Sequence, residues 1–198
     1  RWVTIAEVLS ALETGTRPKG GVHLIAEGVP SISAEHIRSD GSFYFDNLRF
    51  IPREFYSQMK RGHIKRHDIL IVKDGATTGK VAFVDDSFPF KEAVINEHVF
   101  ICRPNPDLIN PYFLFLWLSS QEGQNAIRVC YKGAAIGGIN QQFSRTTKLP
   151  IPPLREQERI IKIIKQIDNS IEEHYSKYGA AKVFVFVSKK HYLRRSTT

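Results

Sequence analysis

Short apolar runs separated by turn residues fill the first hundred positions of the chain. Five of these runs are rich in the β-branched and aromatic residues that favour strands, and they lie at residues 22–25, 43–45, 69–72, 81–84 and 98–101. Asp-Gly pairs, a Gly-Gly pair and prolines lie between them, as is typical of tight turns. The pattern predicts a compact, mostly-β module.

Helical patterns are expected on both sides of this β-rich stretch. Residues 4–12 begin with a threonine, and Glu7 follows it at the spacing of a capping box, which predicts a short helix. Asn110 followed by Pro111 is a strong helix start. The run 112–118 is apolar all round, so we expect this second helix to be buried.

A third helix is expected to begin at Ser120, to carry Ile127 and Val129, and to break at Gly133. It is followed by the glycine-rich stretch 133–138. Such a loop can follow a groove or a phosphate backbone closely, because glycine has no side chain to obstruct the approach. A plain connector is the competing interpretation, and both stay open.

The chain changes character after the proline-rich residues 150–153. No proline follows Leu154, and isoleucines recur with a spacing of four, three and four at Ile160, Ile164, Ile167 and Ile171. This narrow apolar stripe is typical of a coiled-coil seam. We therefore expect a globular domain over residues 1–150, and a long helix for dimerisation and spacing over residues 151–198 that is helical from 154 to about 193.

Length and composition favour an ordinary globular protein. The chain has 198 residues and is 42% hydrophobic, which suits one domain with an appendage. The apolar run 113–118 is far shorter than the roughly 20 residues that a bilayer requires, so no membrane span is expected. Cys102 and Cys130 lie in apolar surroundings with no Cys-x-x-C or histidine spacing, and we expect them to be reduced core residues of a cytoplasmic protein.

The net charge of +8 suggests a nucleic-acid partner, but its distribution weakens that inference. Residues 176–198 contain six of the 28 cations and no acid, which leaves 22 cations against 20 acids in the rest of the chain. The densest cationic segment elsewhere is 60–67, in which six of eight residues can bear positive charge. It fits contact with DNA phosphates, and a solvated loop is the alternative.

The segment DGATTGK at residues 74–80 superficially resembles a phosphate-binding loop. That loop needs four residues between its glycines and a hydroxyl residue after the lysine, whereas here three residues separate Gly75 from Gly79 and Val81 follows Lys80. The apolar run after the lysine predicts a strand instead of the required helix. We expect a tight turn between two buried strands.

Nothing else in the sequence predicts catalysis. His63 and His67 are four residues apart, but they lie among four cations that would repel a metal ion. We therefore expect no catalytic residues, no metal site and no cofactor, and a protein that is not an enzyme.

Several segments in a fixed order resemble the specificity subunits of type I restriction-modification systems. They are Trp2 followed by TGTRP, then HDILIVKDGATTGKVAFV, INEHVFICRP, NPYFLFLWLSSQEGQNAI and LPIPPLREQERIIKIIKQID, and together they extend from residue 2 to about 178. The resemblance implies an α+β fold, with a mostly-β target recognition domain that has short helices, followed by a long coiled-coil-forming helix. Residues 182–198 are rich in valine and phenylalanine and depart from the charged, leucine-rich helix of the family.

The resemblance also implies a function. Such a domain reads one half of a bipartite DNA target, and two antiparallel helices hold two domains apart at a set distance. Reading uses side chains that reach base edges, and our candidates are Lys60, Arg61, Lys65, Arg66, Thr77, Thr78, Lys80, Lys132, Asn140, Gln141, Gln142 and Arg145.

The partners implied by the family are double-stranded DNA, methyltransferase subunits that supply S-adenosylmethionine chemistry for DNA methylation, and a restriction subunit. A second copy joined through the long helix, or a second recognition domain, is also expected. Two alternatives stay open. One is a DNA-binding coiled-coil scaffold outside restriction-modification, and the other is a nucleotide- or S-adenosylmethionine-dependent enzyme.

Overall fold

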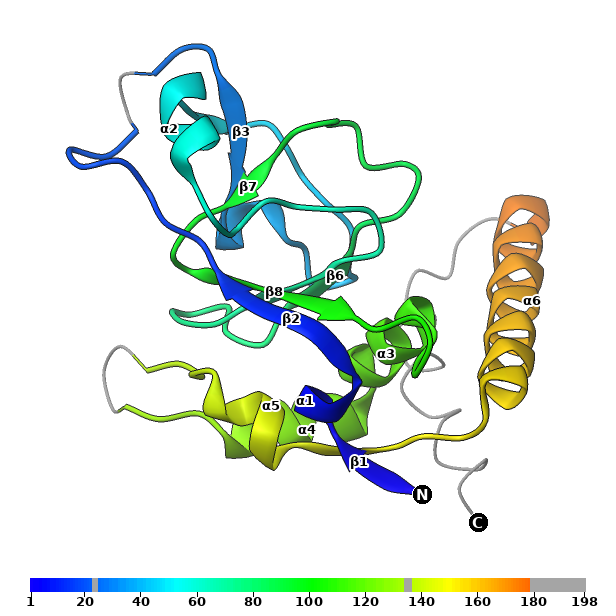
Figure 1. The fold of residues 1–198 in the computed structure, drawn as a ribbon. Coiled ribbons are helices and arrows are strands. Elements are labelled where there is room, and N and C mark those ends of the chain that lie inside the picture. Colours follow the sequence, from blue (N-terminus) through cyan, green and yellow to red (C-terminus); the bar gives the residue numbers. More distant parts are fainter. Residues whose placement is uncertain (23–24, 134–136, 179–198) are drawn as a thin grey trace.

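The computed structural model describes residues 1–22, 25–133 and 137–178, without the side chains of 172 and 175–178 (Figure 1). Its central element is a four-stranded antiparallel sheet in the order β2-β8-β5-β6. The strands are β2 (Leu9–Thr14), β8 (Val99–Pro104), β5 (Ile69–Val72) and β6 (Val81–Phe83). The predicted strands at 69–72, 81–84 and 98–101 are thereby confirmed, each within two or three residues of its expected ends.

Both faces of this sheet are covered, which explains why its central strands are apolar without alternation. In β5, Ile69 and Ile71 belong to the main core, whereas Leu70 and Val72 belong to a second core on the other face. The residues of β8 divide between the two cores in the same alternating way.

Helices cover the main-core face. They are α1 (Ile5–Val8), α3 (Pro111–Ser119), α4 (Gln121–Val129) and α5 (Gln142–Thr146). The two predicted helix starts are confirmed, because the side chain of Asn110 accepts a hydrogen bond from the backbone of Tyr112 at 3.0 Å, and that of Ser120 accepts one from Gly123 at 3.2 Å. The buried α3 lies between the sheet and the C-terminal helix (Figure 1).

A second, three-stranded sheet lies on the opposite face. Its order is β4-β3-β7, formed by β4 (Arg49–Ile51), β3 (Val29–Ile32) and β7 (Val94–Ile95), with the 3-10 turn η1 (Ala34–His36) and α2 (Arg53–Gln58) beside it.

Two of the strand predictions in this region were not confirmed. Residues 43–45 do not form a strand. Phe43 makes only an isolated bridge to Ile37, and contacts between aromatic rings hold the segment in place. Phe43 stacks on Phe45 and meets the edge of Phe88. The predicted strand at 22–25 falls partly on residues 23–24, which lie outside the described residues, and Val22 and Ile25 belong to no strand.

The N-terminal helix is shorter than predicted. Its capping box is present, with the backbone N–H of Thr4 donating to the carboxylate of Glu7 at 2.7 Å. The helix ends at Val8, and from Leu9 the chain continues as β2, which pairs with β8. Pairing with a buried strand satisfies the backbone groups of these residues and so overrides their helical pattern.

The predicted long helix, which we call the stalk, begins as expected with α6 (Leu154–Tyr178), whose 25 residues span roughly 37 Å. The predicted continuation to about 193 lies outside the described residues. The first strand, β1 (Trp2–Thr4), pairs with β9 (Lys148–Pro150) directly before α6, so the start of the chain lies beside the start of the stalk (Figure 1). The α+β fold class with a long C-terminal helix is confirmed.

The isoleucines of α6 occupy two adjacent faces. One face turns toward the domain: Ile160 and Ile161 pack against the main core, and Ile164 is buried. Ile163, Ile167 and Ile171 follow on a neighbouring stripe and are partly exposed. Part of the predicted seam is therefore already covered within one chain, and the coiled coil stays a prediction. No helix in the described ranges combines the length and apolar character needed to cross a membrane.

Candidate nucleic-acid interface

Three loops converge at one end of the four-stranded sheet. The register pairs Thr14 with Phe100 and Val72 with Val99, so β2 and β5 end where β8 begins. The loop after β2, the turn 73–80 between β5 and β6, and the turn 96–98 before β8 therefore lie together. We call these loops, with residues 132–133 and 137–140 described next, the loop end; it faces left in Figure 1.

The turn 73–80 is the strand–turn–strand that the sequence predicts. The backbone N–H of Gly79 donates to Val72 at 2.8 Å, and that of Val72 donates to Lys80 at 2.9 Å. Gly75 and Gly79 have φ angles of 87° and 91°, a region that glycine adopts at little cost. Lys80 leads directly into β6, so the helix that a phosphate-binding loop must open is replaced by a strand.

The glycine-rich segment lies against this turn. Lys132 pairs with Gly138, the N–H of Gly75 donates to Gly137 at 3.3 Å, and the N–H of Ile139 donates to Lys73 at 2.7 Å. A Cβ on Gly138 would lie 2.3 Å from the carbonyl oxygen of Lys73, so only glycine permits this approach. Residues 134–136 lie outside the described residues.

This contact brings together candidates that are more than 50 positions apart in the sequence. Thr77, Thr78 and Lys80 lie on the turn, Lys132 on the paired segment, and exposed Asn140, Gln141 and Gln142 follow it into α5. Arg145 is exposed one helical turn further along α5.

A chain of ion pairs joins the loops and includes residues that the sequence did not single out. Arg17 pairs with Glu97 at 2.8 Å, Glu97 approaches His98 at 3.6 Å, and His98 hydrogen-bonds Asp74 at 2.6 Å. Lys73 closes the chain on Asp74 at 3.1 Å. Partial burial opposes ionisation of Asp74, but the hydrogen bonds from His98 and Lys73 prevail and keep the pKa of this carboxyl below its ordinary value. All five residues lie in segments that carry the family resemblance, but no local pattern indicated that these three segments meet, because they are remote from one another in sequence.

The structure divides the basic segment 60–67 between opposite ends of the sheet. Gly62 lies against Gly15, at the start of the loop after β2, so Lys60 and Arg61 join the loop end. Lys65 and Arg66 lie at the other end. The backbone N–H of Lys65 donates to Asp68, directly before β5, at 2.7 Å, and Arg66 pairs with Asp86 beyond β6 at 3.1 Å.

Lys65 and Arg66 line a hollow of about 370 Å³ at that far end, together with Ile64, Val84, Phe88, Pro89, Phe90 and Lys91. The two halves of the predicted cationic cluster thus face different surroundings, and only Lys60 and Arg61 join the other candidates.

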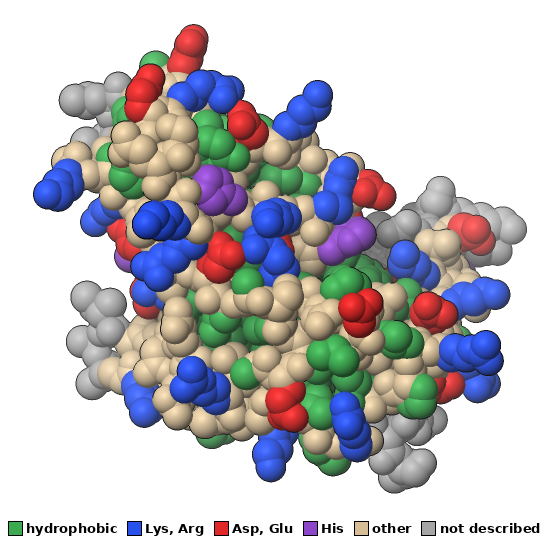
Figure 2. Space-filling view, in the orientation of Figure 1, with side chains coloured by type: hydrophobic (Ala, Val, Ile, Leu, Met, Phe, Trp, Pro, Cys, Tyr) green, Lys and Arg blue, Asp and Glu red, His purple; other side chains and the backbone are tan. Residues whose placement is uncertain are grey.

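Cations predominate at the loop end. Arg17, Lys60, Arg61, Lys73, Lys80 and Lys132 lie there, while the carboxylates of Asp74 and Glu97 are engaged in the ion-pair chain and Glu27 is exposed on the loop after β2. Figure 2 shows lysine and arginine side chains around the hollowed left side of the molecule, where this end lies. A polyanion that carries hydrogen-bonding groups, such as a nucleic acid, fits this combination of cations with exposed amides and hydroxyls.

Comparisons with known proteins agree with one another. The sequence profile of the family described as "Type I restriction modification DNA specificity domain" matches residues 2–177. The chain is 28% identical over 145 residues to the type I restriction enzyme EcoBI specificity subunit of Escherichia coli, and 26% identical over 158 residues to the MjaVIII specificity subunit of Methanocaldococcus jannaschii. These alignments cover 72% and 79% of this chain, but only 29% and 33% of the relatives.

Solved structures show the same fold. The crystal structure of an HsdS subunit from Thermoanaerobacter tengcongensis superposes with a TM-score of 0.65 and 18% identity, over 89% of this chain and 44% of that one. The chain therefore spans less than half the length of each of these relatives.

Proposed function

The chain belongs to the family of type I restriction-modification DNA specificity domains, and from this membership we propose that its loop end binds double-stranded DNA and reads one half of a bipartite target. The observation that carries the proposal is the meeting of three loops and the glycine-rich segment at one end of the sheet. That end combines cations for phosphates with exposed amides for base edges.

Within this surface the side chains take different roles. Lys60, Arg61 and Arg17 are the phosphate contacts, because their charge fixes position on the duplex without reading sequence. Asn140 and Gln141 are exposed beside the turn 73–80 and are candidates for bidentate contacts with adenine. Lys65 and Arg66, at the other end of the sheet, are the weakest of the predicted DNA contacts.

The stalk supplies the spacing. The helix α6 is long enough to hold its domain at a distance from a partner that binds its C-terminal half. The partly exposed stripe of Ile163, Ile167 and Ile171 offers a seam for that partner. We propose that the partner is the helix of a second copy, or of a second recognition domain, packed antiparallel. Helix length then sets the distance between the two half-sites.

The remaining partners follow from the names of the relatives, which are subunits of type I restriction enzymes. We propose that this domain has no catalytic activity and that methyltransferase and restriction subunits assemble around it, the first supplying DNA methylation and the second cleavage. Genomic neighbours that encode such subunits would separate this assignment from a DNA-binding scaffold outside restriction-modification.

A salt-titrated binding assay with a random-sequence duplex tests the DNA interface. Two double variants remove the same charge from opposite ends of the sheet: Lys60→Ala with Arg61→Ala, and Lys65→Ala with Arg66→Ala. Each phosphate contact contributes about 0.9 to the slope of log affinity against log salt. We expect the first pair to lower that slope by about one for each phosphate that is no longer bound, and the second pair to leave it unchanged. Equal effects, or no binding by the unaltered protein, would refute the interface.

A further inference from the structure

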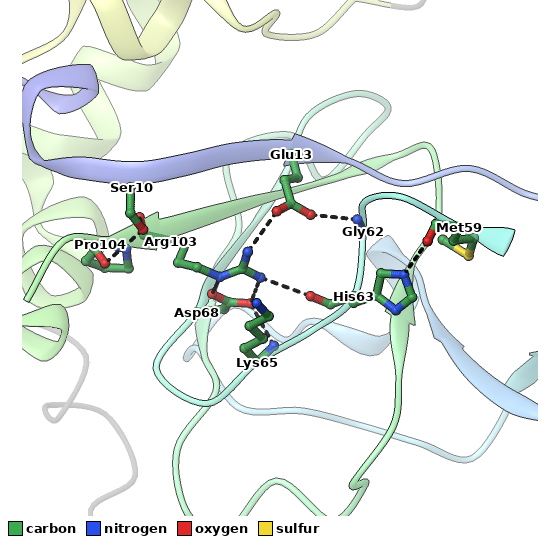
Figure 3. Close-up of polar contacts among 9 residues, drawn as sticks. All are labelled: Ser10, Glu13, Met59, Gly62, His63, Lys65, Asp68, Arg103 and Pro104. Carbon is green, nitrogen blue, oxygen red and sulfur yellow. Dashed lines mark hydrogen bonds and ion pairs between the residues drawn. The ribbon is translucent and has the colours of Figure 1, made fainter. Parts of the chain in front are cut away.

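A buried ion network lies behind the loop end (Figure 3). Arg103, on β8, donates from Nε and Nη2 to the two carboxylate oxygens of Asp68, both at 2.8 Å, and from Nη1 to Glu13, on β2, at 2.7 Å. The side chain of Asp68 is fully buried, and those of Arg103 and Glu13 are 18% and 20% exposed. Burial raises the pKa of Asp68 against the opposing bonds from Arg103.

The same three side chains hold a piece of backbone. The second carboxylate oxygen of Glu13 accepts from the N–H of Gly62 at 2.6 Å, Arg103 donates to the carbonyl of His63 at 3.0 Å, and Asp68 accepts from the N–H of Lys65 at 2.7 Å. Figure 3 shows the segment from Gly62 to Lys65 running past the guanidinium and both carboxylates. This segment directly follows Lys60 and Arg61.

Gly62 is the point at which the basic segment turns toward the loop end. Its φ angle is 85°, its carbonyl accepts from the N–H of Ile95 at 2.9 Å, and a Cβ on it would lie 3.3 Å from the Cα of Gly15. The bond that Gly62 donates to Glu13 therefore fixes the direction in which the chain brings Lys60 and Arg61 to the loop end, beside the loop that carries Arg17.

Stability alone does not account for this arrangement. Buried ion pairs contribute little net stability, because desolvation of the charges offsets their attraction. The guanidinium and the two carboxylates instead form hydrogen bonds with one backbone segment at three places. These bonds favour a single conformation of that segment.

We propose that Glu13, held by Arg103, is a positioning residue that aims Lys60 and Arg61 at DNA phosphates. The proposal rests on the proposed function, because it concerns the same interface. It identifies side chains that do not touch DNA and yet determine how well DNA is held.

The direction in which Glu13→Gln changes the affinity for DNA tests the proposal. The amide removes a negative charge near the interface, so electrostatics alone would tighten DNA binding. It also replaces one carboxylate oxygen by an NH₂ group, which accepts no hydrogen bond, so either Arg103 or Gly62 loses its acceptor on residue 13. We expect weaker binding, by roughly tenfold for each phosphate that is no longer bound, and a smaller salt slope. Glu156→Gln, the same change at the start of α6, is the control and should leave binding unchanged.

A double-mutant cycle separates positioning from general damage. In the Lys60→Ala, Arg61→Ala background, Glu13→Gln should have little further effect, because the side chains that it positions are absent. Arg103→Lys is the second variant. It keeps the positive charge but loses the planar guanidinium that bonds Asp68 and Glu13 at the same time. It should therefore weaken DNA binding in the otherwise unaltered protein and have little effect in the Lys60→Ala, Arg61→Ala background.

Two outcomes are distinguishable. If the unaltered protein binds no duplex, the proposed function fails. If it binds through Lys60 and Arg61 while Glu13→Gln binds as tightly or more tightly, or loses the same factor in both backgrounds, the positioning role is overturned and the DNA interface stands. Urea denaturation of each variant confirms that the compared proteins are folded.

Discussion

The side-chain oxygen of Gln157 accepts a hydrogen bond from the backbone N–H of Asn110 at 2.8 Å, and this bond joins the first turn of α6 to the start of α3. The amide nitrogen of Gln157 donates to the carbonyl of Pro152 at 2.9 Å, and the residue is fully buried. Together with the packing of Ile160 and Ile161 on the main core, this side chain fixes the direction in which the stalk leaves the domain.

Gln157→Ala should loosen the stalk. It leaves the N–H of Asn110 without its acceptor in a partly buried place, which costs about 1 kcal/mol of unfolding free energy. The change is measured by urea denaturation, and hydrogen exchange should show faster exchange in the first turns of α6. Gln166→Ala, at an exposed position of the same helix, is the control. Equal stability of the two variants would contradict the role of Gln157.

Substitutions along α6 should divide into two classes. Ile164→Asp places a charge at a position that is buried within one chain, so it should destabilise the monomer. Ile167→Asp with Ile171→Asp changes the partly exposed stripe, so it should leave the domain folded and reduce self-association. Analytical ultracentrifugation measures the mass, and denaturation measures the fold. An unchanged mass for the Ile167 and Ile171 variant would remove the support for this seam.

Two glycines of the turn 73–80 provide a matched pair. Gly75→Ala and Gly79→Ala both place a side chain at positive φ, which costs roughly 1–2 kcal/mol. The new methyl group at 75 would meet no atom within 4 Å, whereas at 79 it would lie 3.3 Å from Cγ2 of Ile127. Gly79→Ala should therefore be the more destabilising in thermal or urea denaturation. The reverse order would mean that Gly79 does not lie against Ile127 of α4.

His36 should make stability depend on pH. Burial lowers the pKa of His36 below its ordinary value, and its Nδ1 accepts from the N–H of Ser33 at 2.9 Å, so the folded protein favours the neutral ring. The unfolded chain binds a proton near pH 6.5 while the folded chain does not. This contribution to stability is thus present above about pH 6.5 and is lost as the pH falls through that value toward the folded pKa.

The control is His36→Asn, whose side-chain oxygen can accept the same bond but does not titrate. Urea denaturation between pH 7 and pH 5 should show a steeper loss of stability for the unaltered protein than for His36→Asn. Parallel curves would show that His36 is not the group responsible.

Local features were predictable from the sequence because a few neighbouring residues determine them. The caps at Asn110 and Ser120, the turn between Gly75 and Gly79, and the start of the isoleucine-rich helix all form as predicted. The error at 9–12 has the opposite cause, since those residues form a strand through pairing with β8, which is some 90 positions away.

The candidate site depends on distant pairing in the same way. Composition and motifs identified the turn 73–80, the glycine-rich segment and the basic segment as separate candidates. They could not show that the first two touch through Gly138, or that Lys60 and Lys65 face opposite ends of the sheet. Nor could they identify Arg17 or Glu13, whose roles come from partners such as Glu97 and Arg103.

The sequence by itself thus determined the helix caps, the turn between Gly75 and Gly79, the strands at 69–72, 81–84 and 98–101 and the family resemblance, because caps, glycine turns and apolar periodicity act within about one turn or one strand. Only the tertiary structure decided which loops share a surface and which cations point toward it. The reason is physical: strand order and register set the distances between residues that are remote in the chain, and hydrogen bonds and ion pairs act only over those final distances.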